Sequence, residues 1–258
     1  SIYASTGQKI VSSGDGGAIL MWGGSSDLLH ARRVTPSGAL DWPSAVELTS
    51  SSSAWDIDIS QDESGGAIMS WIEYPAIHTQ RVDSFGTVLW GPEEVAGTPP
   101  SSASYGLPTI VSDGTGGAFI SWTLAGSSDL SSSRTNGVYV QHMDPSGAAQ
   151  WFPFGIWMSS EHSSQHYCDI TSDGAGGAIV VWHDERSTYL NDDWEVIRNY
   201  DVYAQRVDSD GNTLWISSGV EVNSRIGNQS LVRVECDGSG GFIIGWTDDD
   251  LDSLFVQR

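Results

Sequence analysis

The stretch Asp113-Gly114-Thr115-Gly116-Gly117-Ala118-Phe119-Ile120-Ser121-Trp122 decides the fold. It joins a turn signal, in which glycine supplies positive φ and Asp bonds the backbone ahead of it, to a short apolar run that ends in Trp. The same phrase returns at intervals of about 50 to 65 residues, which indicates a repeat architecture. The five copies are Gly16-Gly17 to Trp22, Gly65-Gly66 to Trp71, Gly116-Gly117 to Trp122, Gly176-Gly177 to Trp182 and Gly240-Gly241 to Trp246.

Two further landmarks follow each phrase in the same order. The first is a strand-like segment: Arg32-Arg33-Val34, Gln80-Arg81-Val82-Asp83, Gln141-His142-Met143-Asp144, Gln205-Arg206-Val207-Asp208 and Gln257-Arg258. The second is a Gly with a Trp shortly after it, in the first four copies: Gly38/Trp42, Gly86/Trp90, Gly147/Trp151 and Gly211/Trp215. Each copy reads as four strands, and in the third they are Leu107 to Val111, Ala118 to Trp122, Val138 to Met143 and a segment around Trp151.

Four-stranded units of about 50 residues are typical of propeller blades. One blade cannot bury both its faces, so neighbours must stack, and the repeated tryptophans fill the space between them. We therefore predict an all-β, five-bladed β-propeller of four-stranded antiparallel blades, one domain over 1–258. The expected blades are approximately 1–47, 48–98, 99–160, 161–224 and 225–258. A β-sandwich is the alternative, but it does not explain landmarks that return in one order.

The fifth copy reaches Arg258 after its third strand, so we expect the fifth blade to lack its outer strand in this chain. Three explanations stay open. The parent chain continues past Arg258, residues 1–6 act as a short clasp, or a neighbouring molecule donates the strand. The last makes self-assembly through the edge of the fifth blade a hypothesis, since an open sheet edge is a template for pairing.

These phrases resemble a repeat common in large secreted bacterial proteins. That repeat has an Asp-Gly-x-Gly-Gly-Ala turn, a Trp, a Tyr-Ala-Gln-Arg-Val-Asp strand and a Gly-x-x-x-Trp turn. The closest match here runs from Ser172-Asp173-Gly174-Ala175-Gly176-Gly177-Ala178 through Trp182 and Val202-Tyr203-Ala204-Gln205-Arg206-Val207-Asp208 to Trp215. The resemblance implies a secreted or surface propeller-like array and brings no catalytic residues with it. The first copy departs most, because it has Ser13 at the turn Asp position and lacks the Gln.

The amino-acid composition limits the classes of partner that this chain could bind. The chain has 33 acidic against 11 basic residues and a formal net charge of −22. This balance argues against nucleic acid and against anionic membrane surfaces, both of which attract basic proteins. No apolar run approaches the roughly 18 residues of a membrane span, so we expect no membrane insertion. We expect a secreted or cell-surface protein.

The two cysteines, Cys168 and Cys236, fall at different registers of neighbouring innermost strands. Their four-residue offset corresponds to about 13 Å along a strand. A disulfide needs Cα atoms within about 7 Å, so we expect no disulfide between them.

The meander also predicts where a ligand would bind. The tight turns lie on one face of the blades, and all the length variation falls on the other, so functional residues are expected on the variable loops of blades 3 to 5. Three tryptophans outside the repeat landmarks could stack on a sugar or anchor a partner. The candidate ligand-binding residues are Trp55, Trp157, Trp194, Tyr167, His183, Asp184, Glu185, Arg186, Asp192 and Asp193.

A second group occupies one equivalent position on each innermost strand. The five residues are expected to ring the central channel, where two bases and two acids could pair between blades. Asp169 and Arg233 are the expected pair, and a channel-bound ligand is the alternative. The ring comprises Lys9, Asp58, Thr109, Asp169 and Arg233.

The sequence motifs that could bind a metal ion or carry a glycan are short. Asp248, Asp249 and Asp250 offer carboxylates of the kind Ca²⁺ takes, with solvated loop charge as the alternative. No cofactor other than Ca²⁺ is indicated. His162 and His166, with His183 nearby, lack a third firm ligand for zinc or copper. Asn228-Gln229-Ser230 matches the N-glycosylation pattern.

Regular repeats without a catalytic motif favour a non-enzymatic extracellular binding module. Its partner would be a glycan or a surface protein held by the long loops. A structural subunit of an extracellular assembly, completed by strand donation, is the alternative. A glycan-processing hydrolase is the lesser one, with carboxylates drawn from Asp58, Asp169 and the loop acids.

Overall fold

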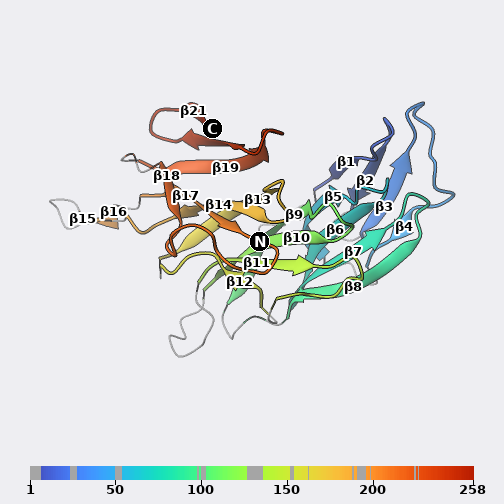
Figure 1. Ribbon diagram of the computed structural model, residues 1–258, viewed down its shortest axis with the longest axis horizontal. Helices are drawn as coiled ribbons and strands as arrows, with labels where there is room; N and C mark the ends of the chain where they lie inside the picture. Colours follow the sequence, from blue (N-terminus) through green and yellow to red (C-terminus); the bar gives the residue numbers. More distant parts are fainter. Residues whose placement is uncertain are drawn as a thin grey trace. The chain divides into compact units, whose positions relative to one another are not determined.

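The described residues of this chain form five antiparallel sheets of four, four, four, four and three strands, and a two-stranded hairpin (Figure 1). This computed structural model confirms the predicted fold class, including a fifth blade without an outer strand. No helix long and apolar enough to cross a membrane occurs among the described residues. Those residues are 7–23, 28–49, 54–97, 99, 103–126, 136–151, 154–161, 163–187, 189–190, 196–197, 199–223, 225 and 227–258.

The chain divides into two compact units, and the boundary between them runs through the third sheet. The first unit comprises Ser1–Pro99, Leu107–Ile120 and Gln141–Gly155. The second comprises Pro100–Gly106, Ser121–Val140 and Ile156–Arg258.

The first two sheets lie in the first unit, and their strands follow one another in simple meander order (Figure 1, blue to green). The innermost strands β1 and β5 are joined by the ion pair between Lys9 Nζ and Asp58 Oδ1, at 2.9 Å. The strands are β1 (Lys9–Ser12), β2 (Ala18–Trp22), β3 (His30–Val34), β4 (Val46–Glu47), β5 (Ala54–Gln61), β6 (Ala67–Glu73), β7 (Ala76–Val82) and β8 (Val88–Ala96).

The remaining sheets keep the same meander, and the fourth is interrupted between its second and third strands by the β15–β16 hairpin. The third sheet is β9 (Ser104–Ser112), β10 (Ala118–Ala125), β11 (Gly137–Met143) and β12 (Ile156–Trp157). The fourth is β13 (Gln165–Ser172), β14 (Ala178–Asp184), β17 (Asp201–Val207) and β18 (Val220–Asn223), with β15 (Tyr189–Leu190) and β16 (Val196–Ile197) in the hairpin. The fifth is β19 (Gln229–Cys236), β20 (Phe242–Asp248) and β21 (Ser253–Gln257).

Hydrophobic cores lie between adjacent sheets. In the first unit Ile19 and Met21 of the first sheet belong to one buried cluster with Met69 and Trp71 of the second. In the second unit the fourth and fifth sheets share a cluster in the same way, through Ile179, Val181, Val202, Ala204, Val232, Val234, Ile244 and Trp246. Fully burying one such side chain stabilises the fold by about 1.5–3 kcal/mol, so stacking supplies the main driving force.

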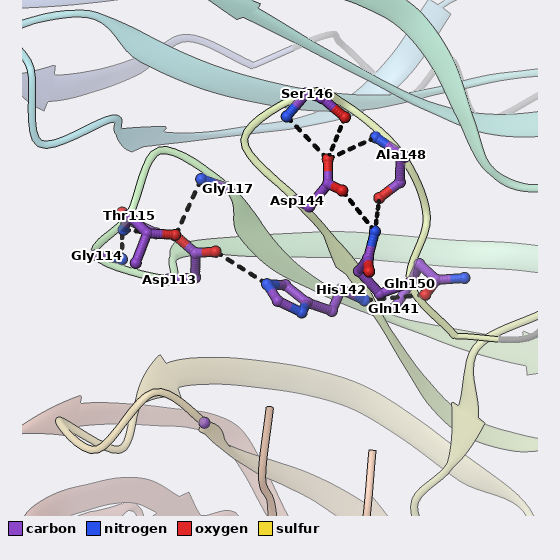
Figure 2. Close-up of polar contacts among 12 residues, drawn as sticks. Asp113, Gly114, Thr115, Gly117, Gln141, His142, Asp144, Ser146, Ala148 and Gln150 are labelled. Atoms are coloured by element: carbon purple, nitrogen blue, oxygen red, sulfur yellow. Dashed lines mark hydrogen bonds and ion pairs between the residues drawn. The ribbon is translucent and has the colours of Figure 1, made fainter. Parts of the chain in front are cut away.

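The Asp-Gly turns carry a carboxylate that is bonded on both sides, as Figure 2 shows for the third sheet. Asp113 Oδ1 accepts the backbone N–H groups of Thr115 and Gly117, at 2.7 and 3.0 Å. Its other oxygen lies 2.9 Å from His142 Nε2 on the third strand. One carboxylate therefore closes the turn and ties it to β11.

The other four sheets have the same clamp with Arg in place of His. Arg81 Nε and Nη2 both donate to Asp62 Oδ2, at 3.0 and 2.9 Å. The corresponding pairs are Arg206 with Asp173, Arg258 with Asp237 and, in the first sheet, Arg33 with Asp15. The first turn has Ser13 at the Asp position, and Asp15, two residues later, supplies the carboxylate instead.

A second carboxylate closes the turn after the third strand. Asp144 Oδ1 accepts the N–H groups of Ser146 and Ala148, at 2.8 and 3.0 Å (Figure 2). Asp83 and Asp208 do the same in the second and fourth sheets. The repeated Asp residues of this sequence therefore serve mainly to close turns.

The outer strand was predicted around the landmark Trp, and in three sheets this is wrong. In these sheets the fourth strand begins after Trp42, Trp151 or Trp215. A side chain of the third strand forms hydrogen bonds with the backbone of the Trp segment, so this backbone does not pair as a strand. Gln205 Oε1 accepts Trp215 N–H at 3.0 Å and its Nε2 donates to Ile216 O at 2.8 Å. Gln141 holds Trp151 in the same way. Arg32 of the first sheet, which lacks the Gln, donates to Trp42 O instead.

Both cysteines lie in the second unit, and no disulfide joins them, as predicted. Cys168 is buried and accepts a hydrogen bond from Ser121 Oγ at 3.5 Å, whereas Cys236 is exposed.

The clamps should contribute differently to the free energy of unfolding, depending on how deeply each one is buried. The Asp62 side chain is 0% exposed, so Arg81→Ala would leave a buried charge without its partner, and the free energy of unfolding should fall by about 3–5 kcal/mol. Arg258 is 68% exposed, and Arg258→Ala should cost under about 1 kcal/mol. Urea unfolding of both variants measures the difference, and equal losses would contradict the clamp's dependence on burial.

Candidate functional site

The blade 4 and blade 5 strands place their variable-loop ends together in the second unit. β13 runs toward the turn at Asp173, and β14 returns from it, so His166 of β13 pairs with His183 of β14 at the opposite end of the sheet. In the fifth sheet Gln229 and Ser230 of β19 occupy the corresponding end. This is the face on which the sequence predicts a site.

A pocket of ≈ 400 Å³ opens at this end of the two sheets. Its walls come from β13, β14, β19 and the segments beside β17 and β20. Its lining combines aromatic rings, amides, hydroxyl groups and one carboxylate, which suits a small polar ligand. The lining residues are His166, Tyr167, His183, Tyr200, Asn228, Gln229, Ser230 and Asp249.

His183 forms the buried floor of the pocket, with 2% of its surface exposed. Burial lowers the pKa of its imidazole to about 4, because desolvation penalises the cation. The nearby His166 and Arg233 lower this pKa further, and Asp249 acts in the opposite direction. His183 is therefore neutral at pH 7, with one ring nitrogen able to accept a proton or a hydrogen bond.

Two carboxylates stand at equivalent positions of the fourth and fifth sheets, Asp249 in the pocket lining and Glu185 behind the lining residue His166. Glu185 is the first residue after β14 and Asp249 the first after β20. The backbone N–H of Glu185 donates to Ser164 O at 3.0 Å, and that of Asp249 donates to Asn228 O at 2.9 Å. The Glu185 carboxylate lies 3.3 Å from His166 Nε2, and Asp249 accepts Ser230 Oγ at 2.5 Å.

Several buried polar atoms of the pocket have no hydrogen-bond partner within the described part of the chain. They are His183 Nε2, Asn228 Oδ1, Gln229 Oε1 and His166 Nε2, the last within ion-pair distance of Glu185 but without a hydrogen bond. The Gln229 amide nitrogen donates to Arg225 O and Gly227 O, at 3.2 and 2.8 Å, which fixes its oxygen as the open acceptor. Buried acceptors of this kind are costly unless a ligand or water satisfies them.

Asp184 and Arg186, both predicted to bind ligand, support the pocket from below. Asp184 is fully buried and accepts Ser163 Oγ at 2.5 Å and Trp182 Nε1 at 3.1 Å. Burial opposes its charge, but hydrogen bonds from Arg186, Ser163 and Trp182 outweigh burial and lower the pKa of the carboxyl. Arg186 also lies over the Tyr203 ring, 3.7 Å from its centre.

The other predicted ligand residues are dispersed. Trp55, in the first unit, is half-buried on β5 opposite Ile72. Trp157 is half-buried on β12 opposite Tyr139. Trp194, Asp192 and Asp193 lie outside the described residues, as does His162.

The predicted channel residues take part in contacts between innermost strands. Asp58 pairs with Lys9 and accepts Ile110 N–H at 3.0 Å, on the strand that carries Thr109. In the second unit Asp169 accepts Val234 N–H at 2.9 Å, next to Arg233. Asp58 and Asp169 thus each join their sheet to the next, and the channel ligand stays a prediction.

Metal and glycan signals in this region have local explanations. No group of three or more His, Cys, Asp or Glu able to hold a metal ion occurs among the described residues. Asp248 is buried and accepts Leu251 N–H at 3.1 Å. Asp250 and Asp249 stand in the same turn, and only Asp249 lines the pocket. Asn228 is a half-buried pocket residue, and a glycan attached to it stays a prediction.

Sequence reasoning missed Tyr200, Gln229 and Ser230 as pocket residues. Their position at the variable-loop end of a strand is the signal by which the sequence could have identified them. Tyr200 O accepts Gln229 N–H at 2.9 Å, so these residues of the fourth and fifth sheets are joined through the backbone.

The chain matches no protein-family model and no curated protein. Solved structures do resemble it. The α-L-arabinofuranosidase of Fusarium graminearum has a TM-score of 0.59 and 10% identity, over 100% of this chain and 78% of that one. The α-L-arabinanase of Penicillium chrysogenum has a TM-score of 0.51 and 10% identity, over 100% and 78%. An ulvan lyase has a TM-score of 0.55 and 9% identity, over 96% and 63%. At these identities the likeness shows the fold.

These neighbours contradict the prediction of a non-enzymatic binding module, since they are glycan-processing enzymes. Repeat regularity was taken to argue against catalysis. The structure explains the error: the repeated landmarks are turn clamps and core tryptophans, so regularity describes the scaffold and leaves the variable-loop face free to differ.

The buried neutral His183 should make stability depend on pH. Its folded-state pKa of about 4 lies below the ordinary 6.5, so the unfolded chain binds the extra proton between these values. The free energy of unfolding should therefore fall as pH drops from 6.5 to 4, by up to about 3 kcal/mol from this residue. Unfolding curves across this window should be flatter for His183→Gln, and parallel pH dependence in the two proteins would contradict the assignment.

Proposed function

We propose that this chain is a glycan-processing enzyme whose reaction takes place in the pocket of the second unit. The observation that carries the proposal is that Glu185 and Asp249 stand at equivalent positions of adjacent sheets. Asp249 lines the pocket, and Glu185 lies within ion-pair distance of His166, which also lines it. Glycan-processing enzymes among the structural neighbours support it at the level of the fold.

Hydrolysis of a glycosidic bond requires two carboxyl groups with different tasks. One protonates the departing oxygen, and the other acts as base toward water or as nucleophile toward the sugar. We assign these tasks to Glu185 and Asp249 as a pair. Asp58 and Asp169 are assigned a structural role instead, because neither lines the pocket and each accepts a backbone N–H of a neighbouring innermost strand.

Each of the two carboxylates interacts with a histidine of the pocket. His166 lies within ion-pair distance of Glu185, and Asp249 acts electrostatically on His183. Because His183 stays neutral at pH 7, it can accept a hydrogen bond from a sugar hydroxyl without adding a charge to the pocket. Its neighbours can then carry out acid and base catalysis in a partly desolvated space.

The proposal also places the protein outside the cell or on its surface, where polymeric glycans are found. The resemblance of the repeats to those of secreted proteins supports this location. The long-loop interaction with surface proteins and self-assembly through β21 remain predictions from the sequence.

Turnover of a glycan tests the proposal. The wild-type chain is incubated with a panel of neutral and acidic polysaccharides, and released reducing ends and unsaturated products are both measured. Asp249→Asn and Glu185→Gln should each reduce the rate at least about 100-fold, the scale of general acid–base catalysis.

Asp252→Asn is the matched control. Asp252 lies in the same turn region, is exposed and has a φ of 47, a backbone conformation that Asn also tolerates. This variant should keep wild-type activity. Failure of the panel, or full activity in Asp249→Asn, would contradict the proposed function.

A further inference from the structure

A strained residue recurs at one position of the innermost strands. Asp56, Leu107, Tyr167 and Leu231 each stand six residues before the turn Asp and have φ values of 50, 34, 45 and 53. Strand pairing shifts register around this position in β5, β13 and β19. Residues with side chains rarely adopt this conformation, and bulges of this kind re-aim a side chain.

In the second unit this bulge brings Tyr167 to the pocket. Tyr167 is 59% exposed and lines the pocket, and its ring meets His183 edge-on with 5.9 Å between ring centres. An aromatic ring of this size left in solvent forgoes burial that the fold would otherwise gain. Its exposure is therefore maintained by the backbone against both steric and hydrophobic preference.

Leu231 occupies the equivalent position on the neighbouring innermost strand. β13 and β19 are joined by hydrogen bonds from Val234 N–H to Asp169 and from Cys236 N–H to Thr171, at 2.9 and 3.2 Å. Leu231 is 67% exposed. An aromatic ring and an aliphatic side chain thus project from the same end of two adjacent strands.

Two polar atoms beside this apolar pair can accept hydrogen bonds. Gln229, only 1% exposed, presents Oε1, and His183 presents Nε2, which accepts when the imidazole proton is on Nδ1; neither atom has a hydrogen-bond partner within the described residues. Hydroxyl groups are donors that such atoms accept. Neither Lys nor Arg is among the described residues that line the pocket, and Asp249 adds a negative group to its wall.

We propose that Tyr167, extended by Leu231, is the stacking platform of a subsite for a neutral sugar residue. The apolar face of the sugar ring lies on Tyr167, and its hydroxyls donate to Gln229 Oε1 and His183 Nε2. The inference rests on the proposed function and narrows its substrate to uncharged glycans, because Asp249 adds a negative charge to the pocket wall and neither Lys nor Arg lines the pocket in the described part of the chain. Arg233 acts on His183 from outside that lining.

Binding affinity tests the platform separately from catalysis. The Kd of neutral pentose and hexose oligosaccharides, and of uronic-acid oligosaccharides, is measured by calorimetry for the wild type and its variants. Tyr167→Ala should weaken binding of the neutral ligand at least about tenfold, and Tyr167→Phe should stay within about threefold. Tyr74→Ala is the matched control, since Tyr74 is also an exposed tyrosine, at 70%, but lies in the first unit.

A stability readout separates this role from a structural one. Tyr167→Asn suits the left-handed backbone, so it should leave the Tm unchanged or raise it while weakening binding as Tyr167→Ala does. Unchanged affinity in Tyr167→Ala, an equal loss in Tyr167→Phe, or tighter binding of the uronic-acid series would overturn the inference. Binding that depends on Tyr167 without turnover would sink the proposed enzyme and leave this subsite standing.

Discussion

The turn carboxylate is the interaction on which the rest of this structure depends. In each sheet it accepts backbone N–H of its own turn and binds an Arg or His side chain of the third strand. Asp62 with Arg81 and Asp113 with His142 show that the partner can change while the geometry stays. The clamp fixes the register of the first three strands, and register decides which side chains enter the core between sheets.

With register fixed at the turn end, the opposite end of each sheet is free to vary. The same strands that carry the clamp deliver His166, His183 and Gln229 to the variable-loop face. The pocket therefore needs few dedicated structural residues. Asp184 is the main one, since its hydrogen bonds to Ser163 and Trp182 hold the end of β14 in place.

Much of the fold could be predicted from the sequence because its landmarks report local chemistry. Gly-Gly turns, the apolar run before Trp122 and the spacing of the copies indicated five stacked sheets, and the cysteine register excluded a disulfide. The outer strand could not be placed, because the side chains of Gln141 and Gln205 take hydrogen bonds that a strand would have used. These side-chain hydrogen bonds, formed in place of strand hydrogen bonds, depend on tertiary contacts, which leave no periodic pattern in the sequence.

The sequence predicted the face of the sheets on which the pocket lies, but not the full set of residues that line it. Tyr167, His183 and Glu185 were named from their loops, but Tyr200, Gln229 and Ser230 became pocket residues through packing of the fourth sheet against the fifth. The bulge at Tyr167 is likewise invisible in sequence, since Asp56, Leu107 and Leu231 share its conformation without sharing its chemistry. Function was misjudged for a related reason, because repeat regularity belongs to the clamps and not to the loops.

The most direct test of this account follows the side-chain NMR signals of the six histidines while a neutral oligosaccharide is added. The account predicts that the His183 and His166 signals shift in a saturable way, while His142, bonded to its turn carboxylate, does not move. Saturable binding that leaves His183 unperturbed would contradict the claim that the pocket of the second unit is the glycan site.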